Sequence, residues 1–377
     1  MMHAFARSVV HTFAAISLAV PVVAANAHDS VDHQLEEMRV ERMQEATVAF
    51  LATLDDQQRE NVMSALDDNA TRTSWSNLPI TMAPRSGMPV ASMSSEQRRA
   101  LHVMLGAAMS SQGYLKSATI MWHEDVLREM FDTMVAAMPE SDPRKQQALA
   151  FADNYDTEKF FVTVFGDPES ENWGWLVTGH HFAANFTVSG GKIAFTPMFL
   201  GANPQVVQEG RYAGWQLLQH EADRALDLLN SLDEGQLGQA VVAAEVDGSI
   251  FAGPGNQDSH KTAFGIKASD LNSMQRRLLA GLIDEYLGDA SDEAAARQRA
   301  KIDADGPDAL RFAWWGPTDE PTGRYMFRVQ GPSVLIDYVR ERSGDGSNNH
   351  VHSIMRDPSN DYGADWLKRH YEEAHQE

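Results

Sequence analysis

Near its C-terminus the sequence reads NNHVHSIMRDPSNDYG, from Asn348 to Gly363. His350 and His352 are separated by one residue, and the segment from Tyr325 to Ile354 has the pattern of a strand hairpin. Residues two apart on a strand point out of the same face of a sheet. The spacing therefore predicts two neighbouring imidazoles, which can supply two ligands of a metal site. A second interpretation is that the two rings line a polar face and form local hydrogen bonds.

A metal site built on this pair needs a third nitrogen or oxygen donor. The sequence has one adjacent histidine pair, His180-His181, and it lies in another predicted hairpin. Neighbours on a strand face opposite ways, so only one of the two can reach a given site. We predict His181 as the third ligand, with His180 as a hydrogen-bonding support and Asn185 on the same strand face as His181.

Four polar residues near the His-x-His pair are predicted to support it. Asp337 lies among apolar residues and needs a partner, which is either the metal or an arginine. Asp357 and Asp361 follow the histidines and can orient imidazoles from behind, although the same residues also suit a turn held by Asx-type hydrogen bonds. Arg356 can hold a substrate carboxylate or an oxyanion.

Other sequence signals carry less chemistry. His123-Glu124 and His220-Glu221 lie in predicted helices, but neither has the i, i+4 histidine spacing of a helical zinc pair. The sequence contains no Gly-x-Ser-x-Gly elbow, no Walker loop and no dinucleotide fingerprint after a strand. A serine hydrolase triad stays open, because triads are recognised by geometry.

Composition narrows the classes of site and partner. The 377 residues include no cysteine, so thiolate catalysis, thiolate ligands and disulfides are excluded and any metal must be held by nitrogen and oxygen. The formal net charge of -22 repels phosphate backbones and anionic lipids. We therefore expect no nucleic-acid partner. No segment after the first 27 residues is apolar over a length that spans a bilayer, so we expect no stable membrane insertion, and a small molecule as the substrate or ligand.

The first 27 residues have the layout of a secretory signal. Arg7 precedes an apolar run from Phe13 to Ala25, and Ala25-Asn26-Ala27 forms an A-x-A cleavage site. The run is shorter than the roughly 20 residues of a membrane anchor. We predict a periplasmic or secreted protein that is cleaved near Ala27.

The hydrophobic pattern alternates between helical and strand segments. Helices are predicted over residues 35–66, 94–109, 114–138 and 206–229, and strands over residues 160–165, 173–188, 192–199, 311–315, 323–330 and 333–341.

Two short motifs occur twice in the chain. Leu54-Asp55-Asp56-x-Gln58 is matched by Leu232-Asp233-Glu234-x-Gln236. Gln97-Arg98-Arg99-x-Leu101 is repeated as Gln275-Arg276-Arg277-x-Leu279, and both pairs are 178 residues apart. We predict an α+β fold, an internally duplicated unit of helices followed by antiparallel strand hairpins. The expected arrangement is one pseudo-symmetric domain over residues 28–377, with a first half at about 40–205 and a second half at about 206–360.

Several segments together resemble a bacterial family catalogued as domain of unknown function 3500. They are Trp75 to Pro79, Ser95 to Arg98, Gly174 to His181, Phe199 to Pro204, and His350-x-His352 with Arg356-Asp357-Pro358. The resemblance covers nearly the whole mature chain. It implies a single extended domain that is often exported, and it carries over no catalytic role.

The leading functional hypothesis is an exported metal-dependent enzyme in which His181, His350 and His352 hold zinc, copper or iron. Zinc with an open position would support hydrolysis, whereas copper or iron would support oxidation. The alternative is a non-catalytic periplasmic metal-binding or ligand-binding protein, whose site is closed by a fourth ligand such as Asp337. A third hypothesis is a structural domain in which these histidines lie far apart.

Overall fold

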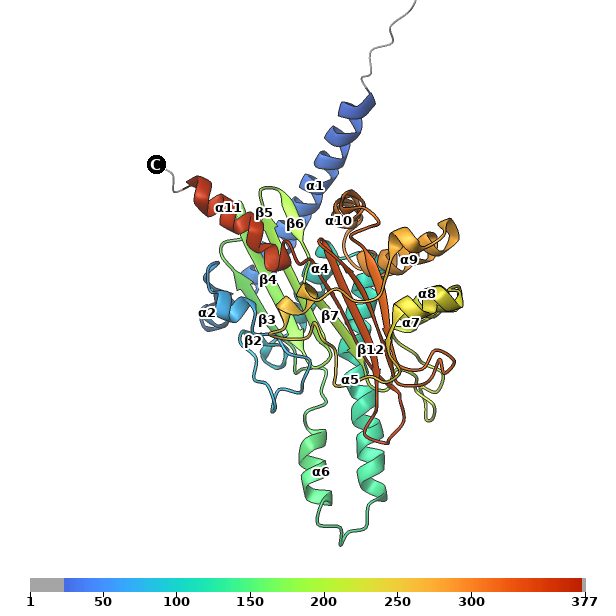
Figure 1. Cartoon of the computed structure of the whole chain (residues 1–377). Coiled ribbons are helices and arrows are strands. Elements are labelled where there is room, and N and C mark those ends of the chain that lie inside the picture. Colours follow the sequence, from blue (N-terminus) through green and yellow to red (C-terminus); the bar gives the residue numbers. More distant parts are fainter. Residues whose placement is uncertain (1–23, 375–377) are drawn as a thin grey trace, which may run out of the picture.

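The computed structural model describes residues 24–374, and the side chains within that range except at 24–33, 257 and 373–374 (Figure 1). The predicted leader, residues 1–27, falls almost wholly outside the described part. Within it, helices and strands combine into the α+β architecture that the sequence predicts.

Along the chain, helices come before and after each run of strands. Their bounds are α1 Ala24–Ala52, α2 Asp56–Val62, α3 Asn69–Arg72, α4 Ser95–Ala108, α5 Ser111–Ala137, α6 Lys145–Ala152, α7 Gln219–Asn230, α8 Glu234–Ala240, α9 Ser273–Leu287, α10 Asp292–Asp305 and α11 Ala364–Ala374. Short 3₁₀ turns are η1 Val90–Ser92, η2 Gln257–Lys261, η3 Ala268–Asp270 and η4 Asp361–Gly363.

The strands join into one large mixed sheet. Their bounds are β1 Met63–Ser64, β2 Met88–Pro89, β3 Phe161–Phe165, β4 Asn172–Gly179, β5 Phe182–Ser189, β6 Lys192–Ala194, β7 Met198–Ala202, β8 Val241–Ala243, β9 Ile266–Lys267, β10 Arg311–Trp315, β11 Tyr325–Gly331, β12 Val334–Glu341 and β13 His350–Arg356. The order is β1-β3-β4-β5-β7-β13-β12-β11-β10-β8. The strands of the N-terminal part and those of the C-terminal part therefore meet where β7 pairs with β13.

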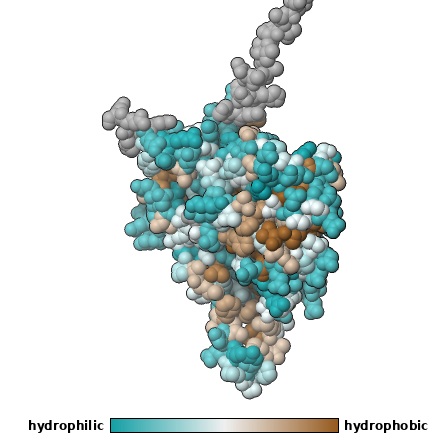
Figure 2. Space-filling model, in the orientation of Figure 1, coloured by the Kyte–Doolittle hydropathy of each residue, from teal (hydrophilic) through white to brown (hydrophobic). Residues whose placement is uncertain are grey.

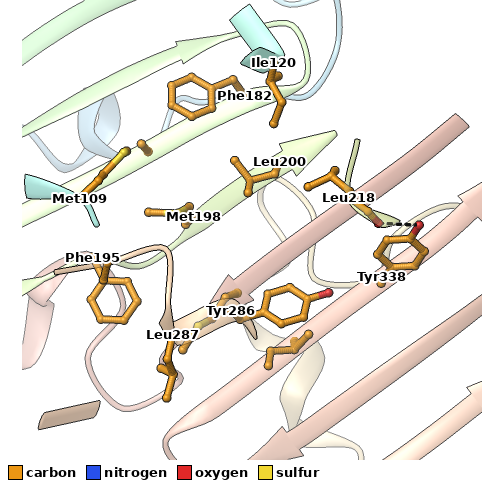
Figure 3. Close-up of a cluster of buried hydrophobic side chains, with 14 of the residues drawn as sticks. Met109, Ile120, Phe182, Phe195, Met198, Leu200, Leu218, Tyr286, Leu287 and Tyr338 are labelled. Carbon is orange, nitrogen blue, oxygen red and sulfur yellow. Dashed lines mark hydrogen bonds between the residues drawn. The ribbon is translucent and has the colours of Figure 1, made fainter. Parts of the chain in front are cut away.

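The sheet is buried on both faces, which we call the helix side and the loop side. On the helix side, Phe182, Leu200 and Tyr338 pack against apolar residues of α1, α4, α5, α7 and α9, and Figure 3 shows part of this cluster. On the loop side, Phe199 and Ile354 lie under loop residues such as Trp75, Ile250 and Ala252. Strand residues alternate between these two clusters, as a period of two requires.

Capping boxes mark the beginnings of α2 and α8. Asp55 accepts a hydrogen bond from the Gln58 amide, and the Gln58 side chain accepts one from the Asp55 amide, which forms a capping box. Asp233 and Gln236 form the same box at α8. These residues belong to the repeated motif, so the repetition in sequence corresponds to a repeated local structure.

The predicted helix over residues 206–229 is wrong in its first half. Only Gln219–Asn230 is helical, and the preceding residues form a loop closed by a bridge between Val206 and Gln216. Gly210 and Gly214 adopt φ values of +81° and +90°, a left-handed backbone that ends helical hydrogen bonding. The helix was predicted because apolar residues recur at helical spacing in this segment, although two glycines lie within it.

The second half of α5 and the shorter α6 form a pair that projects beyond the sheet, at the bottom of the view in Figure 1. The projection carries exposed apolar side chains, among them Met134 and Leu149, and Figure 2 shows it partly tan and brown. Among the helices described, none has the length and apolarity of a membrane span.

Candidate metal centre

Three imidazoles meet where the two strand groups join. Nε2 of His181 lies 2.9 Å from Nε2 of His350, and the ring centroid of His352 is 5.4 Å from that of His181 and 4.5 Å from that of His350. One nitrogen from each ring lies within 4.8 Å of the other two. Two ligands with bonds of about 2 Å to one ion lie roughly 3 to 3.4 Å apart, so the His181–His350 pair is close to the separation that a shared ion requires.

Strand pairing brings these rings together. His352 is opposite Gly201 in the β7–β13 register, and the Gly201 amide donates a 2.8 Å hydrogen bond to the His181 carbonyl. A Cβ on Gly201 would lie 2.9 Å from Cδ2 of His181 and 3.1 Å from Cδ2 of His352. Glycine at this position therefore provides the space in which the two rings approach each other.

The predicted strand position of His180 and His181 is wrong. The two residues form the turn between β4 and β5, and His181 has φ +58°, a left-handed conformation that is uncommon outside glycine. Because the chain turns here, the rings do not point to opposite faces. They stack with centroids 3.7 Å apart. The turn thus brings both imidazoles to the same region of the molecule.

The rings are withdrawn from water. His181 is 2 % exposed and His352 is 4 % exposed, whereas His350 is partly accessible. Burial and the neighbouring rings lower the pKa of His181 well below its ordinary value, and burial with the charge of His352 lowers the pKa of His350 to about 3. The neutral form of imidazole is the one that binds a metal, so burial favours metal binding by these two rings.

Glu341 lies behind the site and was not predicted from the sequence. Its Oε1 is 3.4 Å from Nδ1 of His352, and it also accepts a hydrogen bond from the Ser249 hydroxyl. Burial acts to raise the pKa of Glu341, but His352 and Ser249 outweigh it and lower the pKa to about 2. The signal that identifies it is the hairpin register, because Glu341 pairs with His350 across β12 and β13.

A second contact involves Glu124 of α5, a residue that helical spacing gave no reason to favour. Nδ1 of His180 lies 2.8 Å from Oε1 and 3.0 Å from Oε2 of this carboxylate, and Nδ1 of His181 lies 3.9 Å from Oε1. Burial raises the pKa of Glu124, and the contact with His180 only partly offsets this effect. Glu124, His180 and His181 form a second group whose donor atoms are close enough to hold an ion.

Asp337 and Asn185, which were predicted to support the histidines, have other partners. Asp337 forms an ion pair with Arg328, with Nε–Oδ1 and Nη2–Oδ2 distances of 2.6 and 2.7 Å, and it also accepts a hydrogen bond from the Ala252 amide. Asn185 donates a 2.9 Å hydrogen bond to the Pro197 carbonyl. Of the two partners that the sequence left open for Asp337, the arginine is the one present.

Arg356, Asp357 and Asp361 stabilise the loop side. Arg356 donates to the Ala252 carbonyl at 2.8 Å and pairs with Asp361 at 2.5 Å. Asp357 pairs with Lys301 at 2.6 Å and accepts hydrogen bonds within its own turn. Asp357 and Asp361 were expected to orient imidazoles and Arg356 to hold a substrate carboxylate or an oxyanion, but the partners found are Lys301, the Ala252 carbonyl and one another.

Two surface cavities lie near the histidine cluster. One is polar, has a volume of about 620 Å³ and includes Glu341, Arg342 and Asn348 in its lining. The other has a volume of about 530 Å³ and lies between α5 and the loop after Pro204, with Asn349 and Tyr212 in its lining. The first is lined by Glu341, which pairs with His350 across the hairpin, and the second by Asn349, which precedes His350 in the chain.

Comparison with known families gives one match. The model of a family described as "Protein of unknown function (DUF3500)" matches residues 36–364, a range that includes every residue of both histidine groups. Comparisons with curated proteins and with solved structures gave no match.

Proposed function

Because the chain belongs to the DUF3500 family, whose description names no activity, we propose its function from the site itself. His181, His350 and His352 bind one transition metal ion, which is zinc, copper or iron. The protein is a metal-dependent enzyme acting on a small molecule, hydrolytic if the ion is zinc and oxidative if it is copper or iron.

The observation that carries this proposal is the 2.9 Å approach of Nε2 of His181 to Nε2 of His350, with His352 beside them. Three imidazoles from two distant segments are held together. Burial lowers the pKa values of two of them, His181 and His350. The same 2.9 Å contact fits a hydrogen bond between two neutral rings, so the metal analysis described below decides between the two. Glu341 behind His352 supports the same assignment, because ligating histidines commonly have a carboxylate partner on the second nitrogen.

The ion pair with Arg328 removes Asp337 as the fourth ligand of a closed carrier site. The alternative function, a non-catalytic metal-binding or ligand-binding protein, needs a fourth protein ligand, and Asp337 is engaged by Arg328. Three histidines leave a position for water, whose pKa zinc lowers to about 7. The two functions are separated by adding azide to the cobalt-substituted protein. If the site has an open position, azide binds the cobalt ion and the visible spectrum changes. If a fourth protein ligand closes the site, the spectrum stays the same.

The proposed metal site is tested by elemental analysis of untagged protein. We expect at least one transition metal ion per chain, and one ion fewer in the His350→Ala/His352→Ala double variant, because two of its three ligands are lost. The matched control is His220→Ala/His370→Ala, which removes two histidines from the surface helices α7 and α11 and should keep the full metal content. A native protein without metal, which gains no stability when metal is added, would exclude both the enzyme and the carrier.

Gly201 provides a test that leaves every ligand in place. Alanine at this position puts a methyl group 2.9 Å from the His181 ring and 3.1 Å from the His352 ring, and both rings are too buried to move away. We expect metal affinity to fall at least 10-fold and the free energy of unfolding to fall by about 1 to 3 kcal/mol. Calorimetric metal titration and thermal unfolding measure the two effects. Gly238→Ala, in α8 with no atom within 4 Å of the new methyl, should leave metal affinity unchanged and raise the free energy of unfolding by up to about 1 kcal/mol, since alanine favours a helix more than glycine does.

We also propose that the chain arose by duplication of one α+β unit and forms a single domain over residues 28–377. The support is a shared hydrogen-bond pattern. The Gln97 side chain donates to Gln58 and to the Thr53 carbonyl, and Gln275 makes the same bonds to Gln236 and Ser231. Export to the periplasm or the medium is part of the same proposal and rests on the sequence of residues 1–27.

A further inference from the structure

We propose that His181 bridges two metal ions, with Nε2 directed to the ion held by His350 and His352 and Nδ1 directed to a second ion held by His180 and Glu124. This inference rests on the proposed metal site and adds a second ion to it. Both groups of donors include His181, whose Nε2 lies 2.9 Å from Nε2 of His350 and whose Nδ1 lies 3.9 Å from Oε1 of Glu124.

The position of Glu124 is the first argument. This carboxylate is 2 % exposed, and both of its oxygens face Nδ1 of His180, at 2.8 and 3.0 Å. A buried carboxylate requires a compensating positive charge. A divalent ion between Glu124, His180 and His181 would provide this charge, and carboxylate oxygen and imidazole nitrogen are both ordinary zinc and copper ligands.

The surrounding charge favours a cation as well. The charges of Asp156 and Asp125 add to the effect of burial in raising the pKa of Glu124, so these carboxylates oppose its ionised form. A divalent ion would lower that repulsion more than a single protonated imidazole could.

The conformation of His181 is the third argument. The residue has φ +58° in a two-residue turn, a position that glycine commonly occupies. An imidazole kept in that conformation, stacked on His180 and 2.9 Å from His350, presents one nitrogen to each group of donors. If both ring nitrogens of His181 bind metal, this explains why histidine, and not glycine, occupies this position of the turn.

Binding of the second ion changes the protonation of the bridge. A neutral imidazole carries one N–H, and coordination of both nitrogens replaces this proton, which is released to solvent. The bridging ring is then an imidazolate. The two ions differ in access, because Glu124, His180 and His181 are all buried whereas His350 in the other group is partly accessible. We therefore assign the second ion a structural and electronic role beside the accessible one.

Metal stoichiometry by native mass spectrometry tests the bridge, with zinc or copper added to the metal-free full chain. We expect two ions for the wild type, one for Glu124→Gln, and one for His350→Ala/His352→Ala. His180→Gln is a second variant that removes a ligand of the same ion, and it should also bind one. Asp125→Asn, which removes the adjacent exposed acid and no ligand, should still bind two.

Electron paramagnetic resonance of the copper-loaded protein supplies a readout that a merely structural role would not change. Two copper(II) ions on one imidazolate couple, so the wild type should lack the ordinary signal that Glu124→Gln shows. One ion in both the wild type and Glu124→Gln would overturn the second site and leave the proposed function standing. Two ions without coupling would overturn the bridge, and no bound metal would overturn both proposals.

Discussion

Replacing Asp337 with alanine should destabilise the folded chain by about 3 to 5 kcal/mol, because it leaves the Arg328 guanidinium buried without a counter-charge. The side chains of Arg328 and Asp337 are 1 % and 0 % exposed, and both oxygens of Asp337 accept hydrogen bonds from Arg328. The pair also holds the loop side, through the Ala252 amide and the Ser259 carbonyl. Chemical unfolding in urea measures the loss.

The matched control removes both charges. Arg328→Met with Asp337→Leu should recover most of the lost stability, since an apolar pair of similar volume leaves no buried charge unpaired. Metal content distinguishes this structural role from the role of a ligand. The folded Asp337→Ala variant should bind metal as the wild type does. A loss of metal without a loss of stability would show that Asp337 is a metal ligand.

In the Glu124→Gln variant, which keeps only the ion held by His181, His350 and His352, metal affinity should depend only weakly on pH between 7 and 5. Protons compete with a metal for imidazole, and a site of three rings with ordinary pKa values near 6.5 loses roughly 10⁴-fold in apparent affinity over that range. Burial holds the pKa of His350 at about 3 and the pKa of His181 well below 6.5. These two rings stay neutral from pH 7 to 5, so the loss should not exceed the share of a single ring, about 30-fold.

The sign of this effect also governs the metal-free protein. A pKa that is lower in the folded state than in the unfolded state gives stability that is present above pH 6.5 and is lost as the pH falls toward 3. Competition with a chelator at pH 5, 6 and 7, corrected for protonation of the chelator, measures the affinity. A fall in metal affinity of 10³-fold or more would show that His181 and His350 become protonated as exposed histidines do. That result would contradict their burial in the folded protein.

The failures of sequence reasoning at this site have one cause. Asp337 and Glu341 lie on the same strand face, and only the hairpin register shows that Glu341 is opposite His350 whereas Asp337 is opposite Ile354. His180 and His181 follow a strand pattern, yet the chain turns at that point. Register and turn position depend on contacts across the sheet, and a single segment does not contain that information.

What the sequence determined by itself is local. The absence of cysteine restricted any metal to nitrogen and oxygen ligands, and the His-x-His spacing placed His350 and His352 on one face of β13, because side-chain alternation is a property of the backbone. The tertiary structure decided that His181 meets them, through the pairing of β7 with β13 and the space that Gly201 leaves. Strand pairing between distant segments is favoured because it buries both faces of the sheet. The free energy of that burial depends on the whole fold and not on a single segment.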